Sequence, residues 1–159
     1  MDELETLYRR HATAVYRFAL GLSGDPATAE DLVSEAFFRV LTRAPAIRTE
    51  TALAYLLAIA RNAFLQGRRR LRREAPLADV VPDQAPGLPA QLDGRERLES
   101  VLLALRALPE GERAALLLRL DHGLSYEEIA AALGISTGAA KVRVHRARLK
   151  LASARDSKE

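Results

Sequence analysis

Apolar residues recur at three- and four-residue spacing along most of the chain, which is the period of one face of an α-helix. No segment shows the alternating, β-branched pattern of a strand, so we expect an all-α protein. The pattern predicts helices over residues 2–23, 26–42, 50–73, 95–107, 108–122, 126–133 and 137–151.

Residues that begin or end helices stand at the expected borders. Asp25 precedes Pro26, an N-cap followed by proline at the first helical position. Ser125 and Glu128 form the pattern of a capping box, so a helix should begin at Tyr126. Gly134 can adopt the left-handed conformation that ends this helix. Ser136 can then cap the next helix, and Thr49 can cap the one that starts at residue 50.

The stretch 124–151 combines a short helix, a glycine turn and a basic second helix. This combination is typical of a helix-turn-helix, whose second helix enters the major groove of DNA. The cations and the histidine of that helix are Lys141, Arg143, His145, Arg146, Arg148 and Lys150. The alternative is a surface helical hairpin with a solvated basic face, but cap, turn, core spacing and charge all agree with DNA binding.

A proline-rich segment divides the chain. Four of the seven prolines lie between residues 74 and 94, with a local excess of Asp, so no helix can continue through it. We predict a flexible linker at 74–94 between a three-helix domain at 1–73 and a four-helix domain at 95–159. Fully extended, this linker reaches roughly 70 Å, so the two domains could engage separate sites on one duplex.

The predicted second helix carries an unusual outer face. Its inner positions are apolar, and Asp31, Ser34, Glu35 and Phe38 are left on or near the outside. An exposed aromatic ring beside carboxylates suits a protein-binding surface, although periodicity alone favours this no more than a surface without function. His11 falls on the apolar stripe of the first helix, where we expect a packed histidine rather than a catalytic one.

A second basic region lies at the end of the third helix. Its amides and cations are Arg61, Asn62, Gln66, Arg68, Arg69, Arg70, Arg72 and Arg73. Guanidinium groups contact phosphates, and Asn and Gln can hydrogen-bond base edges, so a nucleic-acid contact is predicted here too. A frayed, solvated tail is the alternative.

Composition and charge exclude several other classes. The chain has no cysteine, hence no disulfide or thiolate zinc site, and its three histidines are too scattered for a metal cluster. Its longest apolar run, 52–60, is too short to span a bilayer, and its acidic N-terminus is unlike a signal peptide. No nucleophile–base pair, carboxylate dyad or phosphate-binding glycine loop appears. We therefore expect a cytoplasmic protein without membrane insertion, cofactor or metal, and not an enzyme.

Three motifs in order resemble the extracytoplasmic-function (ECF) sigma factors of the bacterial sigma-70 family. GDPATAEDLVSEAFFRVL looks like the helix that docks on the clamp of core RNA polymerase. YLLAIARNAFLQGRRRLRR looks like the strand-opening helix that contacts the −10 element. LPEGERAALLLRLDHGLSYEEIAAALGISTGAAKVRVHRAR looks like the domain that reads the −35 element. The resemblance implies a sigma-2-like bundle, a sigma-4-like helix-turn-helix domain and a role in transcription initiation.

The resemblance also implies residue roles. Asp31, Ser34, Glu35 and Phe38 would contact the polymerase clamp. Asn62 matches a position that lines the pocket for a flipped −10 base, and cations near such a pocket are physically required. The implied −10 contacts are Arg48, Thr49, Glu50, Arg61, Asn62, Gln66, Arg68 and Arg69. The implied −35 contacts are Arg119, Lys141, Val142, Arg143, His145, Arg146 and Arg148. The implied partners are core RNA polymerase (clamp and flap), promoter DNA and an anti-sigma factor.

Some positions depart from the family pattern. Leu41 and Tyr55 stand where many members have Trp, and we expect these changes to affect packing only. Val142, often polar in the family, can touch a thymine methyl but cannot hydrogen-bond, and His145 often corresponds to an aromatic residue. The loop 44–51 differs most. These departures bear on which promoter is read rather than on the mechanism.

Two rival functions remain at this point. A stand-alone DNA-binding regulator would explain the basic C-terminal helix but gives no role to Phe38 or Asn62. A helical adaptor that binds only protein predicts no salt-sensitive DNA affinity. The predicted function is a sigma factor that binds core RNA polymerase, selects promoters and helps melt the −10 element.

Overall fold

The computed structural model describes residues 2–43, 52–74 and 93–156. Within these ranges the chain is helical and contains no strand, which confirms the all-α class. The helices are α1 (Asp2–Ser23), α2 (Pro26–Arg43), α3 (Ala52–Glu74), α4 (Asp93–Arg106), α5 (Glu110–Leu120), α6 (Tyr126–Leu133) and α7 (Thr137–Asp156). Each begins within two residues of its predicted start. The loop 44–51, with the expected Thr49 cap, and most of the predicted linker lie outside the described residues.

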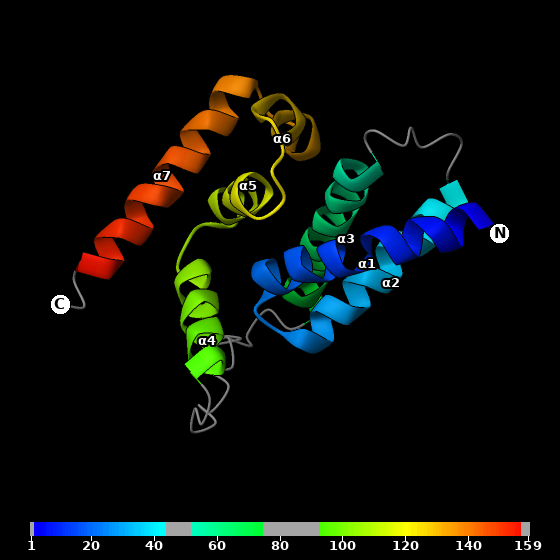
Figure 1. The fold of residues 1–159 in the computed structure, drawn as a ribbon, viewed down its shortest axis with the longest axis horizontal. Coiled ribbons are helices and arrows are strands. Elements are labelled where there is room, and N and C mark those ends of the chain that lie inside the picture. Colours follow the sequence, from blue (N-terminus) through cyan, green and yellow to red (C-terminus); the bar gives the residue numbers. More distant parts are fainter. Residues whose placement is uncertain (1, 44–51, 75–92, 157–159) are drawn as a thin grey trace.

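Helices α1, α2 and α3 pack against one another and form the N-terminal group (Figure 1). Gly24, with φ at 71°, ends α1 in the left-handed region, and the Asp25 carboxylate accepts a hydrogen bond from the Thr28 amide at 3.0 Å. The predicted inner face of α2 is buried throughout: Ala29, Leu32, Val33, Ala36, Phe37 and Val40. The stripe of α1 is fully buried only in its second half, and Tyr8 near its start is half exposed.

Helices α4 to α7 form the C-terminal group. Leu118 of α5, Ile129 of α6 and Val144 of α7 are buried together in its core. The apolar face predicted for α4 is buried only at its end, at Leu105, because its first turns extend beyond the neighbouring helices (Figure 1). Other apolar residues of that face, Leu98 among them, stay exposed.

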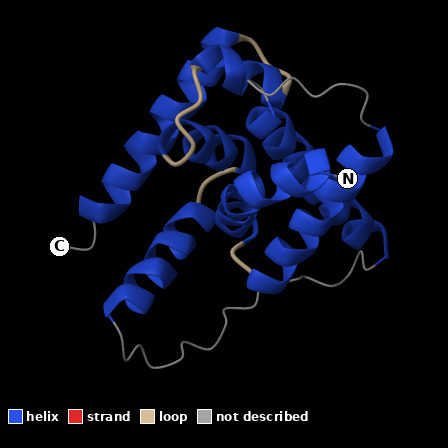
Figure 2. Ribbon diagram, turned by 45° about the vertical axis from the view of Figure 1, so that its right-hand side comes forward, coloured by secondary structure: helices blue, strands red, loops and turns tan. Residues whose placement is uncertain are grey.

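The two groups also contact each other, which the sequence did not predict. Helix α1 packs on α4 and α5, and α3 packs on α6, so one apolar core runs through both groups. Figure 2 shows the helices of both groups gathered side by side. Among the described residues, no helix combines the length and apolar character needed to cross a membrane.

Candidate nucleic-acid and protein interfaces

The helix-turn-helix is held by the predicted local contacts. The Ser125 hydroxyl accepts from the Glu128 amide at 3.1 Å, and the Glu128 carboxylate accepts from the Ser125 amide at 2.9 Å. Gly134 has a φ of 69° and ends α6 in the left-handed region. The Ser136 hydroxyl then accepts from the Ala139 amide at 3.1 Å. These contacts fix the angle at which α7 leaves α6.

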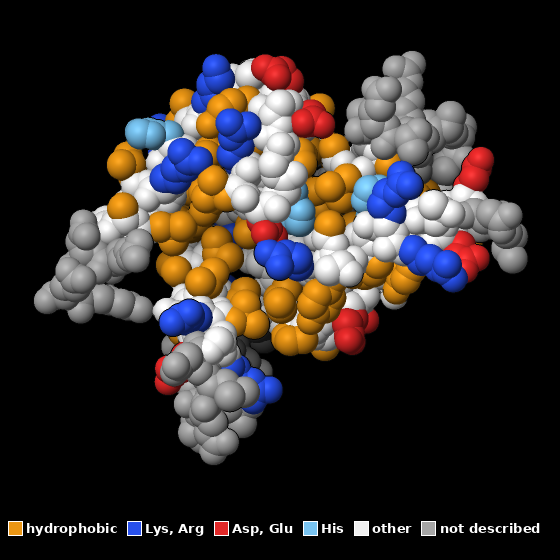
Figure 3. All heavy atoms as spheres, in the orientation of Figure 1, with side chains coloured by type: hydrophobic (Ala, Val, Ile, Leu, Met, Phe, Trp, Pro, Cys, Tyr) orange, Lys and Arg blue, Asp and Glu red, His pale blue; other side chains and the backbone are white. Residues whose placement is uncertain are grey.

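The inner and outer faces of α7 are chemically distinct. Ala140, Val144 and Ala147 point inward and are buried at helical spacing. The residues left exposed include Lys141, Val142, His145, Arg146 and Arg148. In Figure 3, Lys and Arg side chains gather over α7 at the upper left of the molecule. This convex, cationic helix face has the shape and charge to enter a major groove.

Arg119 of α5 supports the helix-turn-helix through two contacts. It donates to the Leu124 carbonyl at 3.0 Å, and its guanidinium lies 4.3 Å from the ring centre of Tyr126. Lys141 approaches the same ring at 5.7 Å. Tyr126 therefore stands beside two cations for which the family resemblance implies a −35 contact, and cation–π attraction favours their positions.

Arg143 lies differently from its exposed neighbours on α7. Its guanidinium packs against Gly111 of α5, where an added Cβ would come within 2.7 Å of one guanidinium nitrogen. Glycine at this position therefore permits the close approach of the arginine to α5. The structure gives Arg143 a contact between helices, and its −35 role stays a prediction.

The basic end of α3 is only partly free. Asn62, Gln66 and Arg69 are exposed, and the guanidinium of Arg68 stands 5.5 Å from the ring centre of Phe64. Arg48, Thr49 and Glu50, the other predicted −10 contacts, lie outside the described residues. Of the predicted −10 set, the structure thus brings five residues together along one helix: Arg61, Asn62, Gln66, Arg68 and Arg69.

The guanidinium of Arg61 already forms an ion pair with a residue of the C-terminal group, Glu110. Its Nε and one terminal nitrogen each donate to a carboxylate oxygen of Glu110, both at 2.7 Å. The two side chains are 12% and 13% exposed. A two-point arginine–carboxylate pair is among the stronger polar contacts in proteins. The predicted phosphate-binding arginine therefore has a carboxylate where a phosphate would sit.

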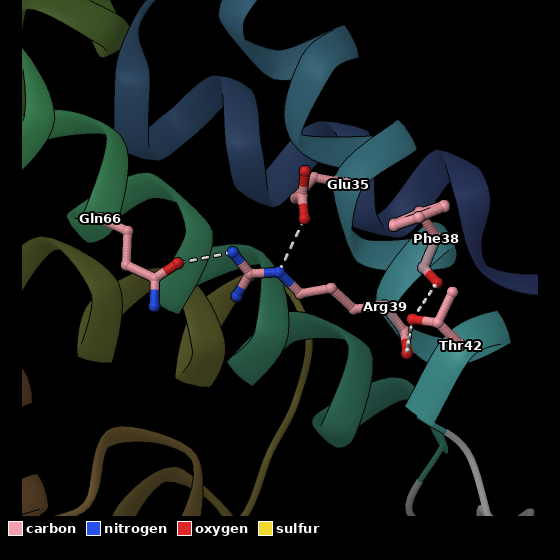
Figure 4. Close-up of polar contacts among 5 residues, drawn as sticks. All are labelled: Glu35, Phe38, Arg39, Thr42 and Gln66. Atoms are coloured by element: carbon pink, nitrogen blue, oxygen red, sulfur yellow. Dashed lines mark hydrogen bonds and ion pairs between the residues drawn. The ribbon is translucent and has the colours of Figure 1, made fainter.

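The predicted protein-binding face of α2 is exposed as expected. Asp31 and Ser34 are exposed, and the Phe38 side chain is 60% exposed. Glu35 accepts from Arg39 Nε at 2.8 Å, and Arg39 also donates to the Gln66 amide oxygen of α3 at 2.6 Å. Figure 4 shows Arg39 between the two, which links the predicted polymerase face to the predicted DNA face.

The expectation that Leu41 and Tyr55 affect packing only is wrong. Leu41 is 62% exposed and Tyr55 40% exposed. Both stand on the outer side of their helices, because the inner positions are filled by residues such as Val40 and Leu56. Their side chains are thus available at the surface.

Sequence reasoning missed the polar residues that join the two groups. Arg17 donates to Asp121 at 3.2 and 2.5 Å, and this contact holds the pKa of that carboxyl below its usual value. Arg113 is buried and donates to the carbonyls of Leu22 and Leu108. Neither contact between the groups had a sequence signal, because Arg17 and Asp121 are 104 positions apart and Arg113 and Leu22 are 91 apart.

Two protein-family models match the chain, one over the N-terminal helix group and one over the C-terminal helix group. The family model for sigma-70 region 2 matches residues 7–74, and the model for sigma-70 region 4 matches residues 98–151. Together they cover most of the chain, in the order that the sequence motifs indicated.

Known proteins are similar over nearly the whole chain. The chain is 41% identical to ECF RNA polymerase sigma factor SigE of Mycolicibacterium smegmatis in an alignment of 157 residues that covers 95% of this chain and 61% of that protein. It is 38% identical to EcfG of Rhodopseudomonas palustris over 141 residues, covering 86% of this chain and 76% of the relative. The chain thus spans less than two thirds of SigE.

Solved structures are similar as well. The sigma factor RpoE of Bartonella quintana, solved in complex with the anti-sigma factor NepR, matches with a TM-score of 0.78 and 29% identity over 95% of both chains. CnrH, solved with the cytosolic domain of CnrY, matches with a TM-score of 0.70 and 25% identity, covering 98% of this chain and 89% of the other. With both sigma-70 regions present in order, the chain belongs to the ECF sigma factors, a family of promoter-specificity subunits of RNA polymerase, and is not a stand-alone helix-turn-helix regulator.

Proposed function

We propose that this chain binds core RNA polymerase through the outer face of α2, reads the −35 element with α7 and holds the unpaired −10 strand at the basic end of α3. The observation that carries the proposal is the occurrence of both sigma-70 regions in one chain, each with its own exposed face of suitable chemistry. The expected domains are 1–73 and 95–159, with a linker at 74–94.

The proposed division of labour follows from the surfaces. Phe38 with Asp31, Ser34 and Glu35 offers an aromatic ring among acidic and polar groups, which suits a protein partner. The outer face of α7 offers cations and the Val142 methyl groups for base edges and phosphates. Asn62 and the cations of α3 suit a single strand whose base is turned out of the stack.

The proposed partners include an inhibitor. RpoE and CnrH were solved with an anti-sigma factor and with the cytosolic domain of CnrY. The match to RpoE covers both helix groups of this chain in one superposition. This similarity to a sigma factor bound by an anti-sigma factor supports an anti-sigma partner for this chain as well. In the proposed role the polymerase supplies all catalysis. The proposed location is the bacterial cytoplasm, where polymerase and DNA lie.

The test is transcription from fragmented genomic DNA by bacterial core polymerase, with and without the chain, followed by mapping of the RNA 5′ ends. We expect new start sites that share two upstream sequence blocks at fixed spacing. The absence of new starts, with DNA still bound by the chain alone, would contradict the proposed function.

A further inference from the structure

One arginine joins the outer face of α2 to the basic end of α3 (Figure 4). The guanidinium of Arg39 donates from Nε to the Glu35 carboxylate at 2.8 Å and from a terminal nitrogen to the Gln66 side-chain oxygen at 2.6 Å. The Arg39 side chain is only 19% exposed. Because the guanidinium is planar and rigid, these two contacts fix its position within the fold.

The contact with Arg39 decides which way the amide of Gln66 faces. A guanidinium carries only N–H donors, so it can accept nothing from the amide nitrogen. The amide must therefore turn its oxygen to Arg39, since the reversed amide would set donors against donors. A hydrogen bond from a charged donor is roughly twice as strong as a neutral one, which favours this orientation further. Figure 4 shows the amide nitrogen of Gln66 turned away from Arg39.

Gln66 stands on the face of α3 that is proposed to hold the −10 strand. Asn62 lies one helical turn before it and Arg69 about one turn after it, so the three side chains share a face, and all three are exposed. The contact with Arg39 uses only the oxygen of the amide and leaves both N–H donors of its nitrogen. A strand that runs along this face meets a pair of donors at Gln66.

A pair of donors discriminates between bases. On the major-groove edge, guanine displays N7 and O6 and thymine displays O4, all of which are acceptors, whereas adenine and cytosine display an amino group. A free glutamine binds adenine through its oxygen and its nitrogen together. With the oxygen held by Arg39, Gln66 cannot form that pair, and its donors would face the amino group of adenine or cytosine.

We propose that Arg39 is a positioning residue for promoter recognition: it fixes Gln66 as a hydrogen-bond donor that selects guanine or thymine over adenine or cytosine at one position of the −10 element. Arg39 itself touches no DNA in this scheme and acts only through the amide of Gln66. The inference rests on the proposed function, because it assigns the exposed face of α3 to the −10 strand.

The first test compares the four bases at each position of the −10 strand. Holoenzyme is assembled from the full chain and bacterial core polymerase. The probes are fluorescein-labelled single DNA strands that carry the −10 element found by transcription mapping, with one base changed at a time, and anisotropy gives each Kd. Inosine is included as a fifth base, because it carries the carbonyl of guanine where adenine carries its amino group.

At one position, we expect the Kd for guanine, thymine and inosine to be roughly tenfold below that for adenine and cytosine, which is within the range of a single base contact. Gln66→Met should abolish this preference and so identify the position that Gln66 reads. Ratios between bases are compared within one holoenzyme, so a change in polymerase affinity through Glu35 cancels.

Substitutions of Arg39 separate positioning from a merely structural role. Arg39→Met removes the donors but keeps an unbranched side chain, so the amide can turn, and the preference should fall below about twofold. Arg39→Lys keeps a group that only donates and should retain the preference. The matched control is Arg9→Met, because Arg9 also pairs with a glutamate four residues earlier, Glu5 at 2.6 Å, but lies on α1. In the Gln66→Met background, Arg39→Met should leave the ratios unchanged.

The second test measures the amide itself and needs no polymerase. In the free, ¹⁵N-labelled chain, relaxation of the Gln66 side-chain nitrogen gives its order parameter. We expect a value near that of rigid backbone, about 0.85, which Arg39→Met lowers below about 0.6 and Arg39→Lys does not. A mobile amide in the unaltered chain would overturn the inference even if the chain directs transcription.

The outcomes of the base comparison distinguish the inference from the proposed function. A holoenzyme that binds all strands alike, or that keeps its preference in Arg39→Met, overturns the inference and leaves the proposed function intact. A chain that forms no holoenzyme, or whose holoenzyme binds none of the strands, contradicts the proposed function, and the inference fails with it. A preference lost in both Gln66→Met and Arg39→Met, but kept in Arg39→Lys and Arg9→Met, supports the inference.

Discussion

At the scale of single residues, arginines decide which surfaces are free. Arg39 holds Glu35 on one side and Gln66 on the other, so it ties the proposed polymerase face to the proposed DNA face. Arg61 is held by Glu110 and Arg143 lies against Gly111, whereas Arg146 is exposed on the outer face of α7. Arginine side chains thus form contacts within the fold at some positions and are exposed to solvent at others.

Glu35→Arg should weaken binding to core polymerase while leaving the helix content unchanged. The substitution reverses the charge in the centre of the exposed face of α2 and sets two cations four residues apart in place of an ion pair. Binding is measured by labelling the chain and titrating core polymerase, and helix content by circular dichroism. Glu30→Arg, an exposed residue on another side of α2, is the control. Equal affinities for Glu35→Arg and the unaltered chain would remove α2 as the docking face.

Arg146→Ala should cost about 1–3 kcal/mol at one base position of the −35 element if its contact is a two-point bond to a base. The check is a binding series against all single-base variants of the promoter found by transcription mapping. Arg95→Ala, which removes an exposed cation from α4, controls for the loss of charge. An equal loss on every DNA sequence would instead make Arg146 a phosphate contact.

At the scale of elements, the helix-turn-helix is specified almost entirely by local contacts. Ser125 and Glu128 satisfy each other's amides, Gly134 adopts the left-handed conformation, and Ser136 caps α7. Each of these contacts spans a few residues, so its signal is present in a short window of sequence. Helix α4 shows the limit of such signals, because its apolar face is buried only at Leu105.

Ser125→Ala should lower the free energy of unfolding by about 1 kcal/mol, since it leaves the amide of Glu128 without its cap. Urea denaturation followed by circular dichroism measures the change. Ser100→Ala, at an exposed position within α4, should stay within about 0.5 kcal/mol of the unaltered chain. A loss no larger than that of this control would mean that tertiary packing, rather than the cap, holds the start of α6.

At the scale of the whole molecule, one apolar core and a few buried polar groups hold the two helix groups together. His122 lies at this boundary, with its ring edge-on to Phe18 of α1 at 5.8 Å between ring centres. Burial lowers the pKa of His122, the neighbouring Asp121 raises it, and Arg17 lowers it again, with a net decrease. The folded chain therefore favours the neutral imidazole more than the unfolded chain does.

The free energy of unfolding should fall as the pH drops below about 6.5, the unperturbed pKa of histidine. Between that value and the lower pKa of folded His122, the unfolded chain binds more protons, so acid favours unfolding. Asp121 stays ionised through this window, because its own pKa is lowered. Urea denaturation at pH 7.5 and 5.5 should show a smaller pH difference for His122→Gln than for the unaltered chain. His145→Gln, at an exposed position, should keep the full difference, and an equal reduction in both variants would contradict a role for burial.

The sequence by itself determined the described helices, the caps at Asp25, Ser125 and Ser136, and the two sigma-70 regions. These features depend on residues close together in the chain: the apolar period sets each buried face, and Ser125 with Glu128 starts α6 wherever the rest of the chain lies. Motif order then identified the family, because each motif is contained in a short run of consecutive residues.

Only the tertiary structure decided which charged residues face solvent and which face each other. Arg61 and Glu110 are 49 positions apart, and Arg17 and Asp121 are 104 apart, so no periodicity relates them. Their pairing depends on how α1 and α3 pack against α5 and α6. The burial of apolar surface drives this packing, and it acts between residues however far apart they are in the sequence. The sequence therefore shows which residues are basic, whereas the packing of the helices decides which acidic residue each of them pairs with.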